Sequence, residues 1–194
     1  MVVKPAGDGA LPRIDHPHVL PHERVGGLVV SPFVAGGSLE QWLASCGALP
    51  GDLVTVLLAQ LLDALSALHA AGWVHRDVKP GNLLLDPPGR AGPHLWLTDL
   101  GSARPTGTEA APDGTPGYVA PEVCTPTRAM PTHDLYAAGV TAAELLTGRP
   151  PRSPRELPRS PLRPLLRTLI DPDPTRRPSS AATAHALSGG SQRP

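Results

Sequence analysis

Apolar side chains recur at helical spacing along residues 53–71, and they place one apolar face on a predicted long helix. Asp52 is the expected N-cap of this helix, and Gly72 is expected to end it. Polar residues interrupt the stretch, which favours a core helix over a membrane span. The apolar face consists of Val54, Leu57, Leu58, Leu61, Leu65 and Leu68, and the polar interruptions are Gln60, Asp63, Ser66 and His69.

A second buried helix is predicted over residues 132–147, where Leu, Val and Ala dominate the pattern. Thr132 or Asp134 is its expected cap, and Gly148 is expected to end it. Ser38 is the expected N-cap of a short helix that follows a glycine turn. Two more short helices are expected at residues 162–170 and 179–188, and the tail over residues 189–194 is predicted to be disordered.

Short apolar runs between turn residues predict strands. Residues 25–34 contain a tight glycine turn and then an apolar run, which indicates the end of a hairpin and one buried strand. Leu83–Leu85 and Leu95–Leu97 flank a Pro-Gly turn and predict a small hairpin. Residues 1–24 look irregular, and residues 102–119 look like a flexible segment because they show no apolar periodicity.

The composition narrows the class of protein. The 194 residues suffice for one domain with a core or for part of a larger one. Basic and acidic residues number 17 each, so the charge favours neither nucleic acid nor an anionic membrane surface as a partner. Cys46 and Cys124 show no metal-ligand spacing or disulfide framework, which favours free thiols in a reducing cytosol. Because no charged start precedes an apolar run, we expect no signal peptide, no membrane segment and a cytoplasmic location.

The stretch from His75 to Asn82 concentrates polar chemistry in a few positions. A proline and a glycine within it prevent a regular helix, so the loop can aim Asp77, Lys79 and Asn82 at one point. A proton acceptor, a positive charge for a phosphate and an oxygen ligand for a metal are what phosphoryl transfer requires. The stretch therefore predicts a site for this chemistry.

These residues, H-R-D-V-K-P-G-N, resemble the catalytic loop of protein kinases, H-R-D-x-x-x-x-N. The lysine two residues after the aspartate is typical of serine/threonine kinases, and the chain resembles bacterial, Hanks-type members of that family. The resemblance implies that Asp77 orients the substrate hydroxyl and accepts its proton, that Lys79 neutralises the transferring phosphoryl group, and that Asn82 binds magnesium and nucleotide. It also implies ATP and Mg²⁺ as cofactors and a protein that presents serine or threonine as the substrate.

Asp99-Leu100-Gly101 stands 22 residues after Asp77, where protein kinases carry D-F-G. A carboxylate followed by glycine in a loop suits a magnesium ion that bridges nucleotide phosphates, because hard cations prefer oxygen ligands. The resemblance therefore implies that Asp99 and Asn82 hold the metal and belong to the ATP site.

Residues 114–122, G-T-P-G-Y-V-A-P-E, resemble the close of a kinase activation segment. In that family the threonine that matches Thr115 lies near the catalytic aspartate and helps to select serine or threonine substrates. Thr106 and Thr108 are candidate phosphorylation sites, with Arg76 as the phosphate partner by resemblance. The alternative is that both are exposed loop threonines without a role.

Five residues are implied to support the fold rather than the chemistry. His75 and Arg76 open the loop. In kinases the aspartate that matches Asp134 accepts hydrogen bonds from the backbone of the catalytic loop. Glu122 and Arg177 are implied to form an internal ion pair.

The order of strand, glycine turn and short helix around residue 35 resembles the hinge between the two kinase lobes. By this resemblance, Ser31 takes the gatekeeper position and Val34 offers a backbone N–H to adenine. An ordinary strand–turn–helix is the alternative. Val2-Val3-Lys4 resembles the strand V-A-I-K, so Lys4 is the candidate for the lysine that contacts the phosphates.

The implied fold is α+β and protein-kinase-like, with a mostly helical C-terminal lobe and a vestigial N-terminal lobe of one or two strands. The expected boundaries are residues 1–30 for the residual N-terminal lobe, 31–37 for the hinge, 38–188 for the C-terminal lobe and 189–194 for the tail. The sequence favours no particular oligomeric state.

Most of the nucleotide-binding lobe of a kinase is missing from this sequence. It has no G-x-G-x-x-G loop, and no glutamate stands between Lys4 and His16 to pair with the lysine. Three explanations stay open: a truncated or misplaced start, an assembly that another chain completes, or a catalytically inactive remnant. The predicted function is a serine/threonine protein kinase domain, and the alternative is an inactive, pseudokinase-like binding module.

Overall fold

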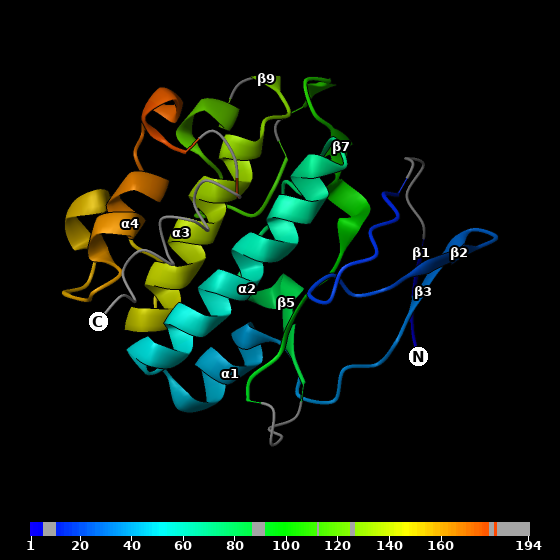
Figure 1. Ribbon diagram of the computed structural model, residues 1–194, viewed down its shortest axis with the longest axis horizontal. Coiled ribbons are helices and arrows are strands. Elements are labelled where there is room, and N and C mark those ends of the chain that lie inside the picture. Colours follow the sequence, from blue (N-terminus) through cyan, green and yellow to red (C-terminus); the bar gives the residue numbers. More distant parts are fainter. Residues whose placement is uncertain (6–10, 87–91, 112, 125–126, 179–180, 182–194) are drawn as a thin grey trace.

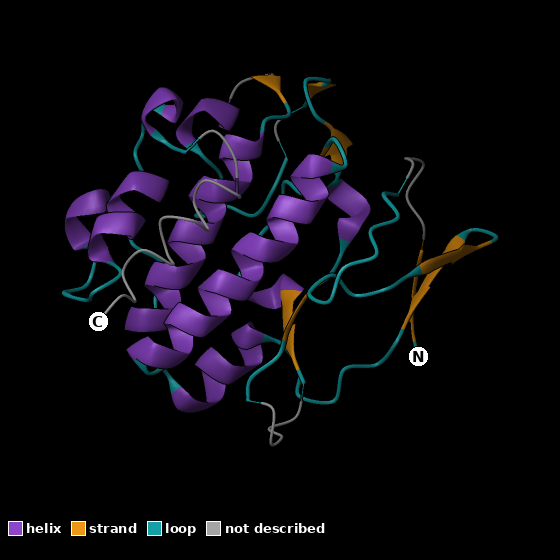
Figure 2. Cartoon of the chain, in the orientation of Figure 1, coloured by secondary structure: helices purple, strands orange, loops and turns teal. Residues whose placement is uncertain are grey.

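The computed structural model describes residues 1–5, 11–86, 92–111, 113–124, 127–178 and 181. Within these residues the chain forms four α-helices and nine short strands. Most of the helices pack together, and a small sheet stands at their side near the N-terminus (Figure 1, Figure 2). The predicted α+β class is confirmed.

Helices α2 (Gly51–Ala70) and α3 (Pro131–Thr147) lie side by side at the centre of the helical part (Figure 1). All the residues of the predicted apolar face of α2 are buried. By length and composition alone α2 could cross a membrane, but core helices pass the same test, and α2 packs against α3 and β6 (Leu95–Leu97). The shorter helices are α1 (Leu39–Cys46) and α4 (Arg163–Leu169).

The predicted helix caps are partly confirmed. Ser38 caps α1, because its hydroxyl and its backbone N–H both bond to the residue three positions further on. The caps predicted for the two long helices are wrong. Pro50 precedes α2 while Asp52 lies in its first turn. Met130 precedes α3, while both predicted alternatives, Thr132 and Asp134, lie inside the helix. The Asp134 carboxylate cannot cap α3, because it bonds to backbone N–H groups outside the helix.

Gly139 lets α4 approach α3 closely. A Cβ atom at this position would lie 2.7 Å from side-chain atoms of both Leu169 and Ile170. Packed carbon atoms do not come so close, so any larger residue here would push the two helices apart.

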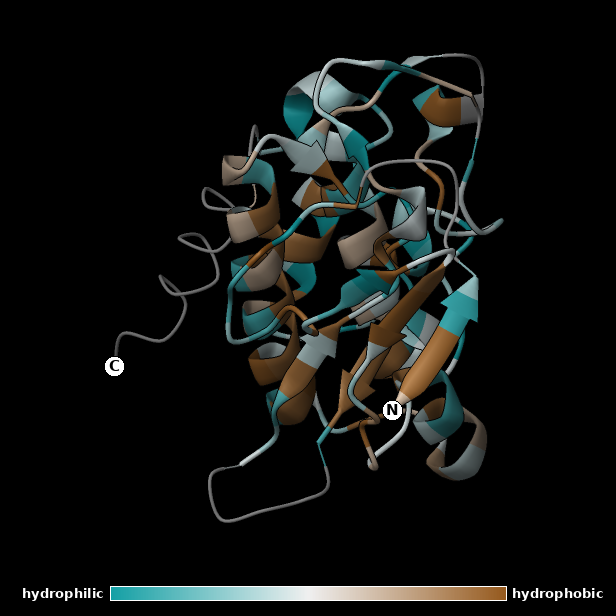
Figure 3. Cartoon of the chain, turned by 90° about the vertical axis from the view of Figure 1, so that its right-hand side faces the viewer, coloured by the Kyte–Doolittle hydropathy of each residue, from teal (hydrophilic) through white to brown (hydrophobic). Residues whose placement is uncertain are grey.

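The strands β1 (Val2–Pro5), β2 (Glu23–Val25) and β3 (Leu28–Ser31) form an antiparallel sheet in the order β1-β3-β2. The sheet has three strands rather than the expected one or two, because β1 pairs with β3 although the sequence around it looks irregular. The expectation that β3 is buried is also wrong, since its residues are exposed or half-buried. Apolar side chains are exposed on this small sheet, which faces the viewer in Figure 3, and they include Val3, Val25 and Leu28.

The predicted hairpin is confirmed as β5 (Leu83–Leu85) paired with β6. The 102–119 segment, which we expected to be flexible, is tied down twice: β4 (Trp73–Val74) pairs with β7 (Arg104–Pro105), and β8 (Glu109–Ala110) pairs with β9 (Thr127–Arg128). Short 3₁₀ turns occupy Pro80–Asn82, Leu100–Ser102, Pro121–Cys124, Pro154–Glu156 and Pro174–Arg176. Apart from Ala181, the helix expected at 179–188 and the tail lie outside the described residues.

The expected partners Glu122 and Arg177 form a bidentate ion pair with N···O distances of 2.6 and 2.8 Å. The Arg177 side chain is 0% exposed, whereas that of Glu122 is 21% exposed. Arg177 also donates to the backbone carbonyls of Asp171 and Thr132, and its guanidinium lies over the ring of Tyr136. The pair joins the 3₁₀ turn Pro121–Cys124, which follows the 102–119 segment, to the chain just after the 3₁₀ turn Pro174–Arg176.

Arg177→Gln should lower the free energy of unfolding by about 3–5 kcal/mol, because it leaves Glu122 and several carbonyls without their partner. Arg176→Gln is the matched control: the adjacent arginine is 72% exposed, and its loss should cost less than about 0.5 kcal/mol. Urea unfolding followed by circular dichroism measures both. Equal losses for the two variants would contradict the structural role of the buried pair.

Candidate active site

The carboxylate of Asp134 holds the start of the 75–82 loop. It accepts hydrogen bonds from the backbone N–H groups of His75 and Arg76, both at 2.8 Å. His69 of α2 donates to the same carboxylate through Nε2, also at 2.8 Å. Burial raises the pKa of Asp134, but the hydrogen bond and charge of His69 and the donors of the loop lower it below its ordinary value. An ionised carboxylate therefore joins α2, α3 and the loop.

His75 connects the carboxylate of Asp134 to the backbone of Asp77. Its Nδ1 accepts a hydrogen bond of 3.2 Å from the backbone N–H of Asp77, so its Nε2 carries the proton and donates to the carbonyl of Thr98 at 3.0 Å. The ring is fully buried. These two hydrogen bonds hold the backbone of Asp77 close to Thr98, the residue before Asp99.

Three side chains converge on the carboxylate of Asp77. Lys79 lies 2.8 Å from Oδ2, Thr115 donates to Oδ1 at 2.8 Å, and Asn82 donates to Oδ2 at 2.9 Å. Lys79 also donates to the hydroxyl of Thr115 at 2.6 Å. Burial raises the pKa of Asp77, but the bonds from Lys79, Thr115 and Asn82 lower it below its ordinary value. Asp77 is therefore ionised at neutral pH and can accept a hydrogen bond from a hydroxyl group.

Asn82 and Asp99 suit a magnesium ion that is shared with phosphates. The carboxamide nitrogen of Asn82 bonds to Asp77, which leaves the other end of the group, its oxygen, to face away. The backbone N–H of Thr98 donates to the carbonyl of Asn82 at 3.0 Å, which brings Asn82 beside the residue before Asp99. Among the described residues, no group of three or more His, Cys, Asp or Glu side chains could hold a metal ion by itself. Carboxylate and amide oxygens such as those of Asp99 and Asn82 are the ligands that a hard cation prefers.

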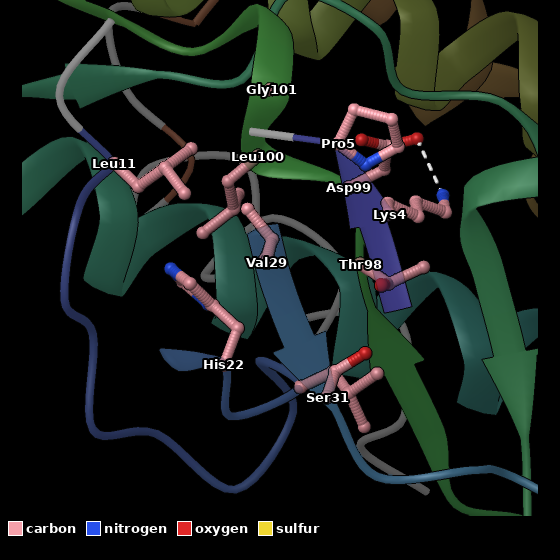
Figure 4. A pocket seen from close by; sticks show the side chains of 11 residues that line it. Lys4, Pro5, Leu11, His22, Val29, Ser31, Thr98, Asp99, Leu100 and Gly101 are labelled. Carbon is pink, nitrogen blue, oxygen red and sulfur yellow. Dashed lines mark hydrogen bonds and ion pairs between the residues drawn. The ribbon is translucent and has the colours of Figure 1, made fainter. Parts of the chain in front are cut away.

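A cavity lies between the small sheet and the turn that contains Asp99 (Figure 4). Lys4 of β1 and Asp99 both line this cavity, and they form an ion pair of 2.9 Å between Nζ and Oδ2. Both side chains are partly exposed, at 53% and 39%. Val29 and Ser31 of β3 also line the cavity. The strand that resembles V-A-I-K thus carries its lysine to Asp99 at this cavity.

Two of the predicted nucleotide residues, Val34 and Asn82, do not line this cavity. Val34 is buried, and its carbonyl accepts a hydrogen bond of 3.4 Å from Gly37 in the turn before α1. Strand β3 ends at Ser31, so Val34 is not part of the small sheet that lines the cavity. The assignment of residues 31–37 as a hinge stays a prediction.

The sequence reasoning missed two side-chain contacts of this site. His69 counted only as a polar interruption of a helix, although its spacing of six residues before His75 could have signalled a shared partner. Tyr118 donates to Glu144 of α3 at 2.5 Å, and burial followed by this bond raises the pKa of Tyr118. Burial also raises the pKa of Glu144. Nothing in the sequence joins these two residues, because they meet only through packing.

Comparison with known proteins agrees with this geometry. The family model of the protein kinase domain matches residues 22–187. The serine/threonine-protein kinase PkaA of Streptomyces coelicolor is 39% identical over 152 residues, which cover 72% of this chain and 27% of PkaA.

Two further relatives come from other organisms. The serine/threonine-protein kinase PknL of Mycobacterium tuberculosis is 36% identical over 128 residues, or 63% of this chain and 31% of PknL. The serine/threonine-protein kinase ULK3 of Xenopus laevis is 32% identical over an alignment 195 positions long, which covers 86% of this chain and 41% of that protein. The chain thus spans between about a quarter and two-fifths of the length of these relatives.

Asp134→Asn should lower the free energy of unfolding at neutral pH by about 3–5 kcal/mol, because it places an amide N–H₂ among N–H donors. The lowered pKa of Asp134 also predicts a pH dependence. Its stabilisation is complete above the unfolded value of about 3.9 and is lost as the pH falls through the lower folded value. Urea unfolding between about pH 7 and pH 3 should therefore show a shallower acid slope for the variant. Identical slopes in the variant and the unmodified chain would refute this account.

Proposed function

Because the chain belongs to the protein kinase family, we propose that it is a serine/threonine protein kinase domain. It transfers the γ-phosphoryl group of ATP to serine or threonine hydroxyls of protein substrates. One observation carries the proposal: the ionised carboxylate of Asp77 is bonded at once by the ammonium of Lys79, the hydroxyl of Thr115 and the amide of Asn82.

Each residue of this cluster has a separate role. Asp77 accepts the hydrogen bond of the substrate hydroxyl, orients its oxygen and takes up its proton. Lys79 lies beside Asp77 and neutralises the charge that develops on the transferring group. Thr115 bonds to both residues and fixes the wall against which a serine or threonine side chain lies. Positioning and electrostatics supply nearly all the catalysis in this chemistry.

Asp99 and Asn82 would hold Mg²⁺, and Lys4 would contact the phosphates of ATP. A magnesium ion bound in this way supplies charge neutralisation between the phosphate oxygens. The Lys4–Asp99 pair supports the assignment, because it brings an ammonium group that can bind a phosphate and a carboxylate that can bind a metal ion to the same cavity. A cytoplasmic location, where ATP and protein substrates are abundant, completes the proposal.

Asp77→Asn should lower kcat for peptide phosphorylation by about 10²–10⁴-fold, because the amide cannot accept a proton. Asp52→Asn makes the same change at an exposed residue of α2 and should leave kcat unchanged. The assay follows the mass increase of a serine peptide with ATP and Mg²⁺. Equal rates for Asp77→Asn and the unmodified chain would sink the proposal. Binding of Mg-ATP without any transfer would instead favour the pseudokinase-like binding module.

Lys4→Gln should weaken the binding of Mg-ATP about fivefold, the factor expected for one partly exposed ion pair. Lys4→Arg should keep most of the affinity, because it keeps the charge. Arg13→Gln removes an exposed charge that does not line the cavity and serves as the control. Calorimetric titration measures the three dissociation constants. An unchanged constant for Lys4→Gln would remove Lys4 from the ATP site.

A further inference from the structure

Charge is divided unevenly along the chain. Residues 1–148 carry eight basic and 14 acidic side chains, a net charge of −6 with the histidines neutral. Residues 149–194 carry nine basic and three acidic side chains, a net charge of +6. The neutral total therefore hides a strongly basic C-terminal part. Six of its basic residues fall within residues 149–167, where Glu156 is the single acid: Arg149, Arg152, Arg155, Arg159, Arg163 and Arg167.

Buried leucines fix these six arginines, which we call the arginine surface, on the outside of the molecule. Leu157, Leu162 and Leu166 lie between the arginines in the sequence and are buried in the core that also contains the leucines of α2. All the arginines of the surface are exposed except Arg163, which is half-buried. Six prolines between residues 149 and 167 restrict the backbone. The arginine surface is therefore held by the core and is not a loose charged tail.

Most of these guanidinium groups have no partner among the residues that the structure describes. This holds for Arg152, Arg155, Arg159 and Arg167. Arg163 differs, because its Nη1 donates to the carbonyl of Leu157 at 2.8 Å. Like charges that lie close together repel one another, and an anion that binds among them removes this repulsion. The arginine surface is therefore suited to bind an anionic partner.

The single acid of the stretch shows that the arginine surface accommodates a carboxylate. Oε2 of Glu156 accepts a hydrogen bond of 3.3 Å from the backbone N–H of Arg152 and lies 3.4 Å from Nη1 of Arg149. A guanidinium presents its N–H donors in a planar fork that matches the two oxygens of a carboxylate. The chain's own carboxylate thus occupies one place on the surface, and the other arginines offer the same donors to carboxylates of another chain.

The arginine surface begins close to the substrate side of the active site. Thr115 of the active-site cluster is followed three residues later by Tyr118, which donates to Glu144 near the end of α3. The N–H of Gly148 then donates back to the carbonyl of Glu144 at 2.7 Å, and Arg149 follows directly. The helix α4, which ends the surface, stands on the opposite side of the core helices from the small sheet and its cavity (Figure 1).

The charge distribution favours a short acidic segment over a long polyanion. DNA or an anionic membrane surface extends far beyond residues 149–167 and would also meet the part of the molecule whose net charge is −6. A run of a few aspartates or glutamates meets the arginine surface alone. An acidic stretch of a protein is therefore the partner that this surface fits.

We propose that the arginine surface docks an acidic segment of the protein substrate, at a distance along the chain from the serine or threonine that is phosphorylated. Carboxylates of the segment bind the guanidinium groups of Arg152, Arg155 and Arg159. This second contact raises the effective concentration of the substrate hydroxyl at Asp77. The docking itself stands on the exposure and charge of the arginines, and the naming of the partner as the substrate rests on the proposed kinase function.

The test uses two positions that are alike in sequence. Arg152 and Arg159 each precede Ser-Pro, both are exposed, and neither guanidinium has a partner in the described part of the chain. Arg152→Gln combined with Arg159→Gln removes two charges, and Arg152→Lys combined with Arg159→Lys keeps them. The matched control is Arg13→Gln combined with Arg176→Gln, which removes two exposed charges outside the arginine surface.

Binding of a fluorescent peptide rich in Asp and Glu, without Ser or Thr, is the first readout, and it needs no enzymatic activity. The double glutamine variant of the arginine surface should weaken binding about tenfold, as expected for the loss of two exposed ion pairs. The double lysine variant should keep most of the affinity, because it keeps the charge. The control should match the unmodified chain. Unchanged binding in the double glutamine variant, or equal weakening in the control, would overturn the proposal.

Duplex DNA and vesicles of phosphatidylglycerol serve as probes for the other anionic partners. At the same salt concentration the unmodified chain should bind both more weakly than the acidic peptide. Tighter binding to either probe that is lost in the double glutamine variant would overturn the proposal and assign the arginine surface to nucleic acid or to lipid.

Phosphorylation of two serine peptides is the second readout. The peptides share a Gly/Ala linker and differ only in a tail, which is acidic in one and made of Asn and Gln in the other. In the unmodified chain the acidic tail should lower KM about tenfold, and the double glutamine variant should remove this advantage. The kcat for the neutral peptide and the dissociation constant of Mg-ATP should stay unchanged, because no arginine of the surface lines the cavity at Lys4.

The two readouts separate docking from catalysis. Equal KM values for the two peptides in the unmodified chain would overturn the proposal that docking serves the substrate. If the unmodified chain phosphorylates neither peptide, the proposed function fails, and the binding data still decide whether the arginine surface docks an acidic segment.

Discussion

The buried carboxylate of Asp134 is the interaction on which the active-site geometry depends. It is placed inside α3, it accepts the first two N–H groups of the 75–82 loop, and it takes a third bond from His69 of α2. A loop that carries proline and glycine has no regular backbone pairing of its own, so its N–H groups need such a partner. Because the carboxylate is fully buried and ionised, the three elements can separate only by leaving a charge without partners.

A series of contacts connects Asp134 to the other residues of the candidate active site. The backbone of His75 is fixed by Asp134, and its ring then sets the N–H of Asp77 on one side and the carbonyl of Thr98 on the other. Thr98 leads directly to Asp99, and Asp99 meets Lys4 of the small sheet. Hydrogen bonds, one peptide link and one ion pair thus connect the core helices to Asp99 and Lys4 at the cavity. The 102–119 segment joins it through Thr115, which donates to the carboxylate of Asp77.

The sequence predicted contacts correctly where the residues that meet lie within a few positions of each other. Asp77, Lys79 and Asn82 fall within six positions, and the structure brings them together because the 3₁₀ turn at Pro80–Asn82 folds them onto each other. The hairpin of β5 and β6 was equally local. The caps of α2 and α3 and the number of strands were misjudged because those features depend on distant partners. The position of Asp134 near the start of a helix predicted a cap, but its carboxylate bonds to the 75–82 loop instead. Val2–Pro5 forms a strand because it pairs with β3, which is distant in sequence.

The sequence by itself determined the family and the two core helices, and it predicted the candidate reacting groups, since periodicity and local spacing are properties of the chain alone. The tertiary structure decided which groups touch. It set Lys4 on Asp99, Tyr118 on Glu144, and Asp113 on Arg76, all pairs that are far apart along the chain. Their meeting depends on how the buried faces of α2 and α3 stack and on where Asp134 then pins the loop. No local pattern encodes such distances, because packing fixes them only when the whole core has formed.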